Sequence, residues 1–226
     1  MPSSLPSPLS RIRELIAAAQ DAGKRDSLAR TLDKAIQSRL ISRETLDGYE
    51  ADLAGVDDAA WQSLKAEALQ RLSWIRARPW EALGDFLNEV KGYAYLKSLG
   101  CTEISFVART YDRKSPDVMA MLEGRRVLCE VKTLILSDAA LSDDFLHGKL
   151  TRTIIEAKAQ LDEFGAADDR KIVTLVFRGE GSPGGDAASC AAQVEAFLAR
   201  GLAQGPAAGV EVTVFERPAA NVGPGP

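Results

Sequence analysis

Three charged side chains interrupt two segments that are otherwise apolar. Asp117 follows Pro116 at the start of the first segment, and Glu130 and Lys132 lie inside the second, residues 126–134. Charges within an apolar strand are costly unless they are paired or bind a cation. Two neighbouring carboxylates repel each other unless a proton or a divalent metal ion lies between them. These residue types therefore predict a site for a hard cation.

The spacing of these residues predicts that they meet. Side chains alternate along a strand, so Glu130 and Lys132 point to one face while Val131 points to the other, into the core. The turn Glu123-Gly124-Arg125 separates the two segments and is of hairpin length. A hairpin would bring Asp117 and Glu130 to the same end of the sheet.

This arrangement suits metal-assisted hydrolysis of a phosphodiester. Carboxylate oxygens bind Mg²⁺, which keeps several waters and takes a further ligand from the substrate phosphate. The metal polarises the phosphoryl oxygen and lowers the pKa of a bound water. A lysine then orients or deprotonates the attacking water, or neutralises charge on the phosphorane, and the sequence leaves these roles of Lys132 open.

The elements that must position this site follow from hydrophobic periodicity. A 3.6-residue period predicts a long helix from Pro79 to Leu99 that is closed by Gly100. The period then changes to two, which predicts strands and further alternation of strands with helices. This order predicts an α/β fold with a mixed sheet and helices on both faces. The segments expected after Gly100 are strands at 103–108, 117–122 and 126–134, a helix at about 146–164, a strand at 171–177, a helix at about 187–202 and a strand at 210–215.

The periodicity of the first 78 residues predicts helices and no strands. Four apolar stripes with the helical period, over 12–19, 28–40, 46–53 and 61–75, are separated by polar or glycine-containing joints. No motif in these stripes carries chemistry. The sequence therefore predicts three parts: a helical bundle or arm at 1–78, an α/β domain at 79–216 and a disordered tail at 217–226.

The motif around the charged residues has a known counterpart. Ser115-Pro116-Asp117, followed after twelve residues by Glu130-Val131-Lys132, resembles the motif of the PD-(D/E)xK nuclease superfamily, which has the restriction-endonuclease-like fold. The α-β-β-β-α-β core of that superfamily matches the order predicted over residues 80–177. The helical region and the tail fall outside the resemblance.

The resemblance implies a role for each matching residue. Asp117 and Glu130 are expected to hold Mg²⁺ or Mn²⁺, and Lys132 is expected to assist catalysis. Many members of the superfamily carry a further acid on the helix before the first strand, as a metal ligand or as support for the ligands. Glu89 occupies that place.

The helix after the third strand supplies candidates for binding nucleic acid. Lys149 and Arg152 are three residues apart and share a helix face. Together with the loop at 109–114 they would contact backbone phosphates; the alternative is a solvated charged face. Lys158 and Gln160 are further candidates, because some subgroups of the superfamily place a Lys or Gln here to contact the site.

Composition narrows the class of protein. The chain has 226 residues, of which 46% are hydrophobic, and 28 basic against 32 acidic groups give a net charge of −4. A protein that coats DNA passively would be strongly basic, whereas local contact with phosphate through metal ions needs no such excess. No apolar run approaches the roughly 18 residues of a membrane span. Three cysteines without metal spacing favour a reduced, cytoplasmic protein.

The expected function is therefore a Mg²⁺- or Mn²⁺-dependent nuclease, an endonuclease acting on DNA in repair, recombination or defence, with RNA left open as a substrate. One alternative is a catalytically inactive restriction-like fold that binds nucleic acid or protein. In another, Glu130 and Lys132 form a solvent-facing cross-strand pair of no catalytic importance. A third is an interaction protein that forms a homodimer through its helical arm.

Overall fold

The computed structural model describes residues 9–21, 43–72, 79–108, 114–137, 143–180, 194, 196 and 208–220. The helix predicted at 28–40 and nearly all of that predicted at 187–202 lie outside the described residues. No described helix is long and apolar enough to cross a membrane.

A five-stranded mixed sheet forms the centre of the molecule, in the order β1-β2-β3-β4-β5. The first three strands are antiparallel neighbours, and β4 and β5 run parallel to β3. The prediction of a mixed α/β fold is thereby confirmed. The strands are β1 (Thr102–Phe106), β2 (Val118–Leu122), β3 (Arg125–Ser137), β4 (Arg170–Glu180) and β5 (Glu211–Ala220).

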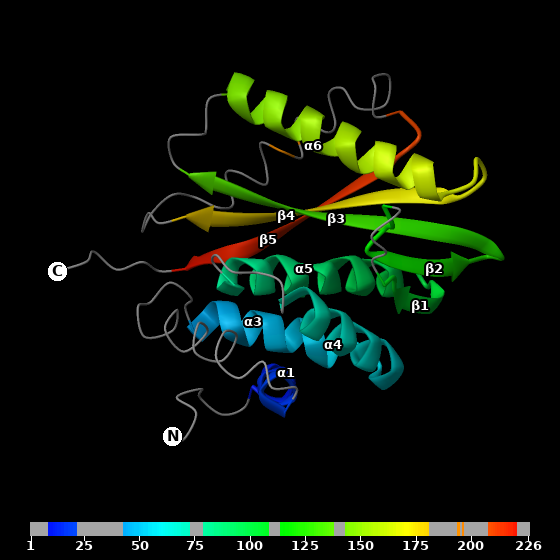
Figure 1. Cartoon of the computed structure of the whole chain (residues 1–226). Coiled ribbons are helices and arrows are strands. Elements are labelled where there is room, and N and C mark those ends of the chain that lie inside the picture. Colours follow the sequence, from blue (N-terminus) through cyan, green and yellow to red (C-terminus); the bar gives the residue numbers. More distant parts are fainter. Residues whose placement is uncertain are drawn as a thin grey trace.

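Helices cover both faces of this sheet (Figure 1). Helix α6 lies on one face, and α5 lies on the other with the remaining helices beyond it. The helices are α1 (Ser10–Asp21), α3 (Arg43–Ala54), α4 (Asp58–Leu72), α5 (Pro79–Ser98) and α6 (Asp143–Phe164).

Strands β2 and β3 form the predicted hairpin. Leu122 pairs with Arg125, so Glu123 and Gly124 make a two-residue turn. Both turn residues have positive φ, 50° and 77° respectively, as the tight turn of a twisted hairpin requires. The turn fixes the register that brings Val118 opposite Cys129.

The central strand β3 is buried on both faces. Val127, Cys129 and Val131 belong to the apolar cluster on the α5 side, whereas Leu128 and Leu134 belong to the cluster on the α6 side. The alternation follows from the two-residue period of a strand. Glu130 and Lys132 share the parity of Leu128 and therefore face α6.

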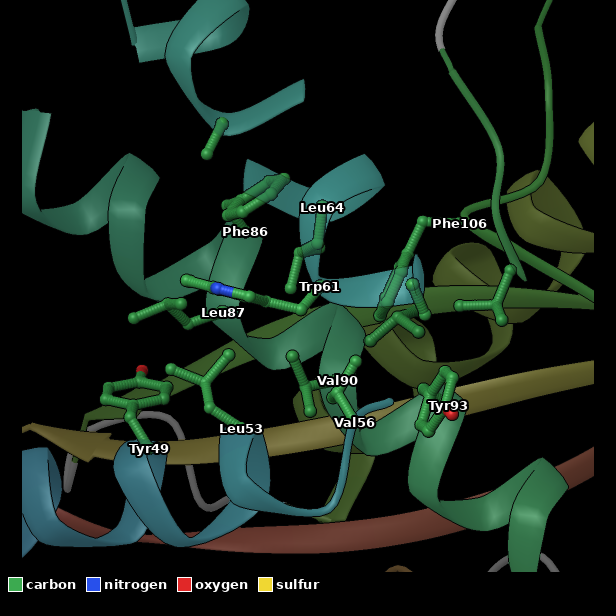
Figure 2. Packing of buried hydrophobic residues seen from close by; sticks show 14 of the residues in the cluster. Tyr49, Leu53, Val56, Trp61, Leu64, Phe86, Leu87, Val90, Tyr93 and Phe106 are labelled. Carbon is green, nitrogen blue, oxygen red and sulfur yellow. The ribbon is translucent and has the colours of Figure 1, made fainter. Parts of the chain in front are cut away.

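The helical region and the sheet share one core. Leu53 of α3, Trp61 and Leu64 of α4, and Val56 between the two helices pack against α5 (Figure 2). The same cluster continues through Val90 of α5 into the strands. The described residues on both sides of the boundary predicted between residues 78 and 79 therefore share a continuous hydrophobic core.

Several predicted boundaries differ from the structure, among them those of β5 and α6. Strand β5 continues to Ala220, so the disorder predicted from residue 217 is wrong for residues 217–220. A strand at the edge of a sheet tolerates a proline such as Pro218. Helix α6 begins at Asp143 rather than near Leu146, so the solvent-exposed His147 lies one turn inside the helix and not at its start.

Candidate active site

Asp117 lies directly before β2 and is held in place at two points. Its Oδ2 accepts a hydrogen bond of 2.8 Å from the backbone N–H of Val131, and its carbonyl accepts one of 3.0 Å from Val107. Because Val118 is opposite Cys129, Asp117 comes next to Glu130 across the antiparallel pair. The side chain is almost fully buried, with 1% of the residue exposed.

Glu130 is fully buried on the face of β3 that α6 covers. Lys132 Nζ donates to its Oε1 at 2.6 Å, and Gln160 Nε2 donates to its Oε2 at 2.8 Å. The Lys132 side chain retains 30% exposure, so the ammonium group lies between the buried carboxylate and solvent. This burial does not match the alternative in which Glu130 and Lys132 form a solvent-facing pair.

Gln160 joins three elements at this point. Besides Glu130 of β3, its Nε2 contacts the carbonyl oxygen of Ser115 at 2.7 Å, in the segment before β2. Gln160 thus contacts Glu130 and the segment before Asp117, and its predicted role in binding nucleic acid stays a prediction. Lys158 instead pairs with Asp162, which also accepts a hydrogen bond of 2.7 Å from Lys171.

The charges of this site fit a cation. When ionised, Asp117, Glu130 and Lys132 together carry two negative charges and one positive charge in a largely buried place. The pKa of the neighbouring Cys129 thiol is raised to about 12, mainly by burial and in smaller part by the negative charges of Asp117 and Glu130. Hard oxygen ligands with residual negative charge are the donors that Mg²⁺ and Mn²⁺ prefer. The residues present therefore fit the predicted ion.

Glu89 is buried in α5, with 4% exposed. Its neighbour Asn88 donates to Thr133 Oγ1 at 3.0 Å, which ties this turn of α5 to β3. Among the described residues, however, no three His, Cys, Asp or Glu side chains gather as a metal-holding group. The role of Glu89 as a third acid stays a prediction.

Charged groups of α6 lie near the exposed side of the site. Arg152 donates to Glu156 at 2.8 Å, and this contact lowers the pKa of Glu156, with smaller contributions from Lys132 and Lys114. Glu156 is thus within electrostatic reach of residues from β3 and from the segment before β2. Lys149 lies one turn before Arg152 and is partly exposed. Residues 109–113 of the loop predicted to assist, 109–114, lie outside the described residues.

The carbonyl of Ser115 is part of the site that sequence reasoning missed. A backbone acceptor has no residue type of its own, so no pattern in the sequence marks it. Comparisons of the chain with family models, curated proteins and solved structures give no match.

Proposed function

We propose that the chain is a Mg²⁺- or Mn²⁺-dependent nuclease of the restriction-endonuclease-like type that hydrolyses phosphodiester bonds of DNA. The observation that carries the proposal is a pair of buried carboxylates at facing positions of the hairpin: Asp117 lies directly before β2, Glu130 lies on β3, and Lys132 binds Glu130. Neither packing nor stability accounts for two buried acids in this place, because each has a desolvation cost. Binding a cation and a phosphate does account for them.

The order of elements supports the same proposal. Helix α5, the antiparallel strands β1, β2 and β3, helix α6 and the parallel strand β4 follow in the sequence expected for this type of nuclease. Asp117, directly before β2, is opposite Glu130 when the register of the β2–β3 pair is continued by one residue, and Lys132 follows two residues after Glu130 on the same face of β3.

Asp117 and Glu130 would hold the ion, which supplies Lewis-acid activation of the phosphate and an acidified water. The chain's own contribution is to orient these ligands. The Val131 N–H fixes Asp117, and Gln160 fixes the Oε2 of Glu130. Ligands that are held by such contacts lose little freedom when the ion and the substrate bind.

Lys132 has two roles that its position allows. In the described structure the Lys132 ammonium group neutralises Glu130. Rotation of the flexible lysine side chain would move this group away from Glu130 and toward solvent. There it would donate to a phosphate oxygen or hold the attacking water. Both roles place positive charge where negative charge develops in the transition state.

Arg152, with Lys149 and Lys114 nearby, would contact the phosphates on either side of the cleaved bond. Arg152 is highly exposed, with 82% of its side chain accessible, so its pairing with Glu156 costs little to break. Such contacts position the strand without selecting a base sequence.

The proposal is tested with purified full-length protein and five substrates: linear duplex, circular duplex, branched and single-stranded DNA, and RNA. Each is incubated with Mg²⁺, Mn²⁺ or EDTA. Cleavage of DNA is expected with either metal and none is expected in EDTA. Lys132→Ala is expected to lose cleavage, whereas Lys97→Ala, on the far end of α5, serves as the matched control.

Two results would contradict the proposal. Cleavage that persists in EDTA and in Lys132→Ala would show a different site or a contaminating enzyme. Binding of nucleic acid without cleavage under every condition would instead favour an inactive binding module.

A further inference from the structure

The hydroxyl group of Ser115 is buried and lacks a hydrogen-bond partner among the described residues. The residue as a whole is 6% exposed. Buried hydroxyl groups are nearly always hydrogen-bonded, because leaving one unpaired costs free energy, so the exception needs an explanation. Its place next to Pro116 and Asp117 relates it to the proposed metal site.

The segment that carries this hydroxyl is held on several sides. Gln160 binds the carbonyl of Ser115, and the same Nε2 atom binds Glu130. Two residues later, Asp117 is held through both its carbonyl and its carboxylate. The backbone therefore has little freedom to carry the hydroxyl to solvent, and rotation about one side-chain bond keeps it close to its own carbonyl.

We propose that Ser115 is a positioning residue of the metal site, whose hydroxyl hydrogen-bonds a water that the bound Mg²⁺ or Mn²⁺ retains. This inference rests on the proposed function, since it needs the ion held by Asp117 and Glu130. It adds a residue to which neither the motif nor the charge pattern assigns a role.

The chemistry of the hydrated ion favours a hydroxyl at this place. Mg²⁺ gives up its waters reluctantly and usually keeps several of them in protein sites. Each retained water donates hydrogen bonds and needs acceptors, and a serine oxygen accepts two while its proton goes to another partner. Partners of this kind orient the groups around a metal ion, and their removal typically weakens metal binding about 10- to 100-fold.

The test compares Ser115→Ala with the wild-type protein and measures binding of Mn²⁺ alone, without nucleic acid, by electron paramagnetic resonance. Melting temperatures are measured in EDTA. The variant is expected to bind Mn²⁺ about tenfold more weakly. Its melting temperature in EDTA is expected to be unchanged or higher, because the substitution removes an unpaired buried hydroxyl. Ser98→Ala, at the end of α5, is the control and should change neither Mn²⁺ affinity nor the site.

The outcomes separate this inference from the proposed function. If Asp117→Asn abolishes Mn²⁺ binding while Ser115→Ala binds as tightly as wild type, the role of Ser115 is overturned and the metal site stands. A clearly lower melting temperature of Ser115→Ala in EDTA would also overturn it, because the hydroxyl would then have a structural partner. If the wild-type protein binds no Mn²⁺, both proposals fail.

Discussion

At the scale of single residues, Lys132 links stability to the proposed chemistry. Its ammonium group is 2.6 Å from a carboxylate oxygen of Glu130, whose side chain is 1% exposed. Removing one partner of a buried ion pair is costly because the other charge stays buried, although partial exposure of the lysine reduces the cost. The same residue that is proposed to act on the phosphate thus also compensates a buried acid.

We predict that Lys132→Met lowers the free energy of unfolding by about 2 kcal/mol, as measured by urea denaturation in EDTA. Adding Glu130→Gln to this variant should recover a large part of the loss, because no buried charge then remains at that position. A double-mutant cycle gives the coupling between the two residues. Equal, additive losses from the two substitutions would show that the pair is not coupled.

Gln160 and Arg152 are expected to affect different kinetic constants. Gln160→Ala removes a hydrogen bond to Glu130 and should lower kcat about 10- to 100-fold with little change in KM. Arg152→Ala removes an exposed positive charge and should mainly raise KM and reduce the dependence of binding on salt. Steady-state cleavage at two salt concentrations measures both. A raised KM with unchanged kcat for Gln160→Ala would instead indicate a direct contact with nucleic acid.

At the scale of elements, the contact between α5 and β3 fixes the strand that carries two of the site residues. Gly92 lies where α5 comes closest to the sheet: a Cβ atom there would be 2.8 Å from Val131 Cγ2 and 3.0 Å from Cys129 Sγ. Neither neighbour is the flexible end of a long side chain, so the helix or the strand would have to move.

Gly92→Ala is therefore expected to destabilise the protein by about 1–3 kcal/mol and to reduce cleavage through displacement of β3. Gly148→Ala in α6 is the matched control, since a Cβ atom there meets nothing within 4 Å. It should leave stability unchanged or raise it by up to about 1 kcal/mol, because alanine favours the helix. Thermal unfolding of both variants checks the prediction. Equal stability of the two would show that the close approach at Gly92 is not a constraint.

The sequence predicts the strand-borne part of the site because that part depends on local rules. Alternation along β3 and a glycine turn are enough to place Glu130 and Lys132 on one face and to bring Asp117 to the same end of the hairpin. Helix α6 is different. Lys158 and Gln160 lie on opposite flanks of its buried stripe, so the periodicity of the helix does not show which of them contacts the site. Gln160 does so because its flank is the one that meets β3 and the segment before β2.

At the scale of the whole molecule, the helical region is part of the structure that supports the site. Trp61 and Leu64 of α4 and Leu53 of α3 pack against α5 within the same cluster that reaches the strands (Figure 2). Hydrophobic periodicity predicted these helices, but it contains no information on whether they pack together as a bundle or against another element. The division at residue 78 could not be tested by pattern alone.

A fragment of residues 79–226 is therefore expected not to fold by itself. Removing α1, α3 and α4 would expose the apolar face of α5, with Phe86, Leu87 and Val90 among its buried residues. Circular dichroism during heating should show no cooperative transition, whereas the full chain should give one. A fragment that unfolds cooperatively would show that the α/β part is an independent domain.

Asp117 and Glu130 are proposed to serve a metal-dependent cleavage of DNA. Single-turnover cleavage of a linear duplex in Mg²⁺, with the protein in excess, tests it most directly when wild type, Asp117→Asn and the exposed control Asp168→Asn are compared after each is shown to be folded. We predict cleavage by the wild type and the control, and a rate at least about 100-fold lower for Asp117→Asn. Equal rates for the two Asp→Asn variants would contradict the assignment of this site.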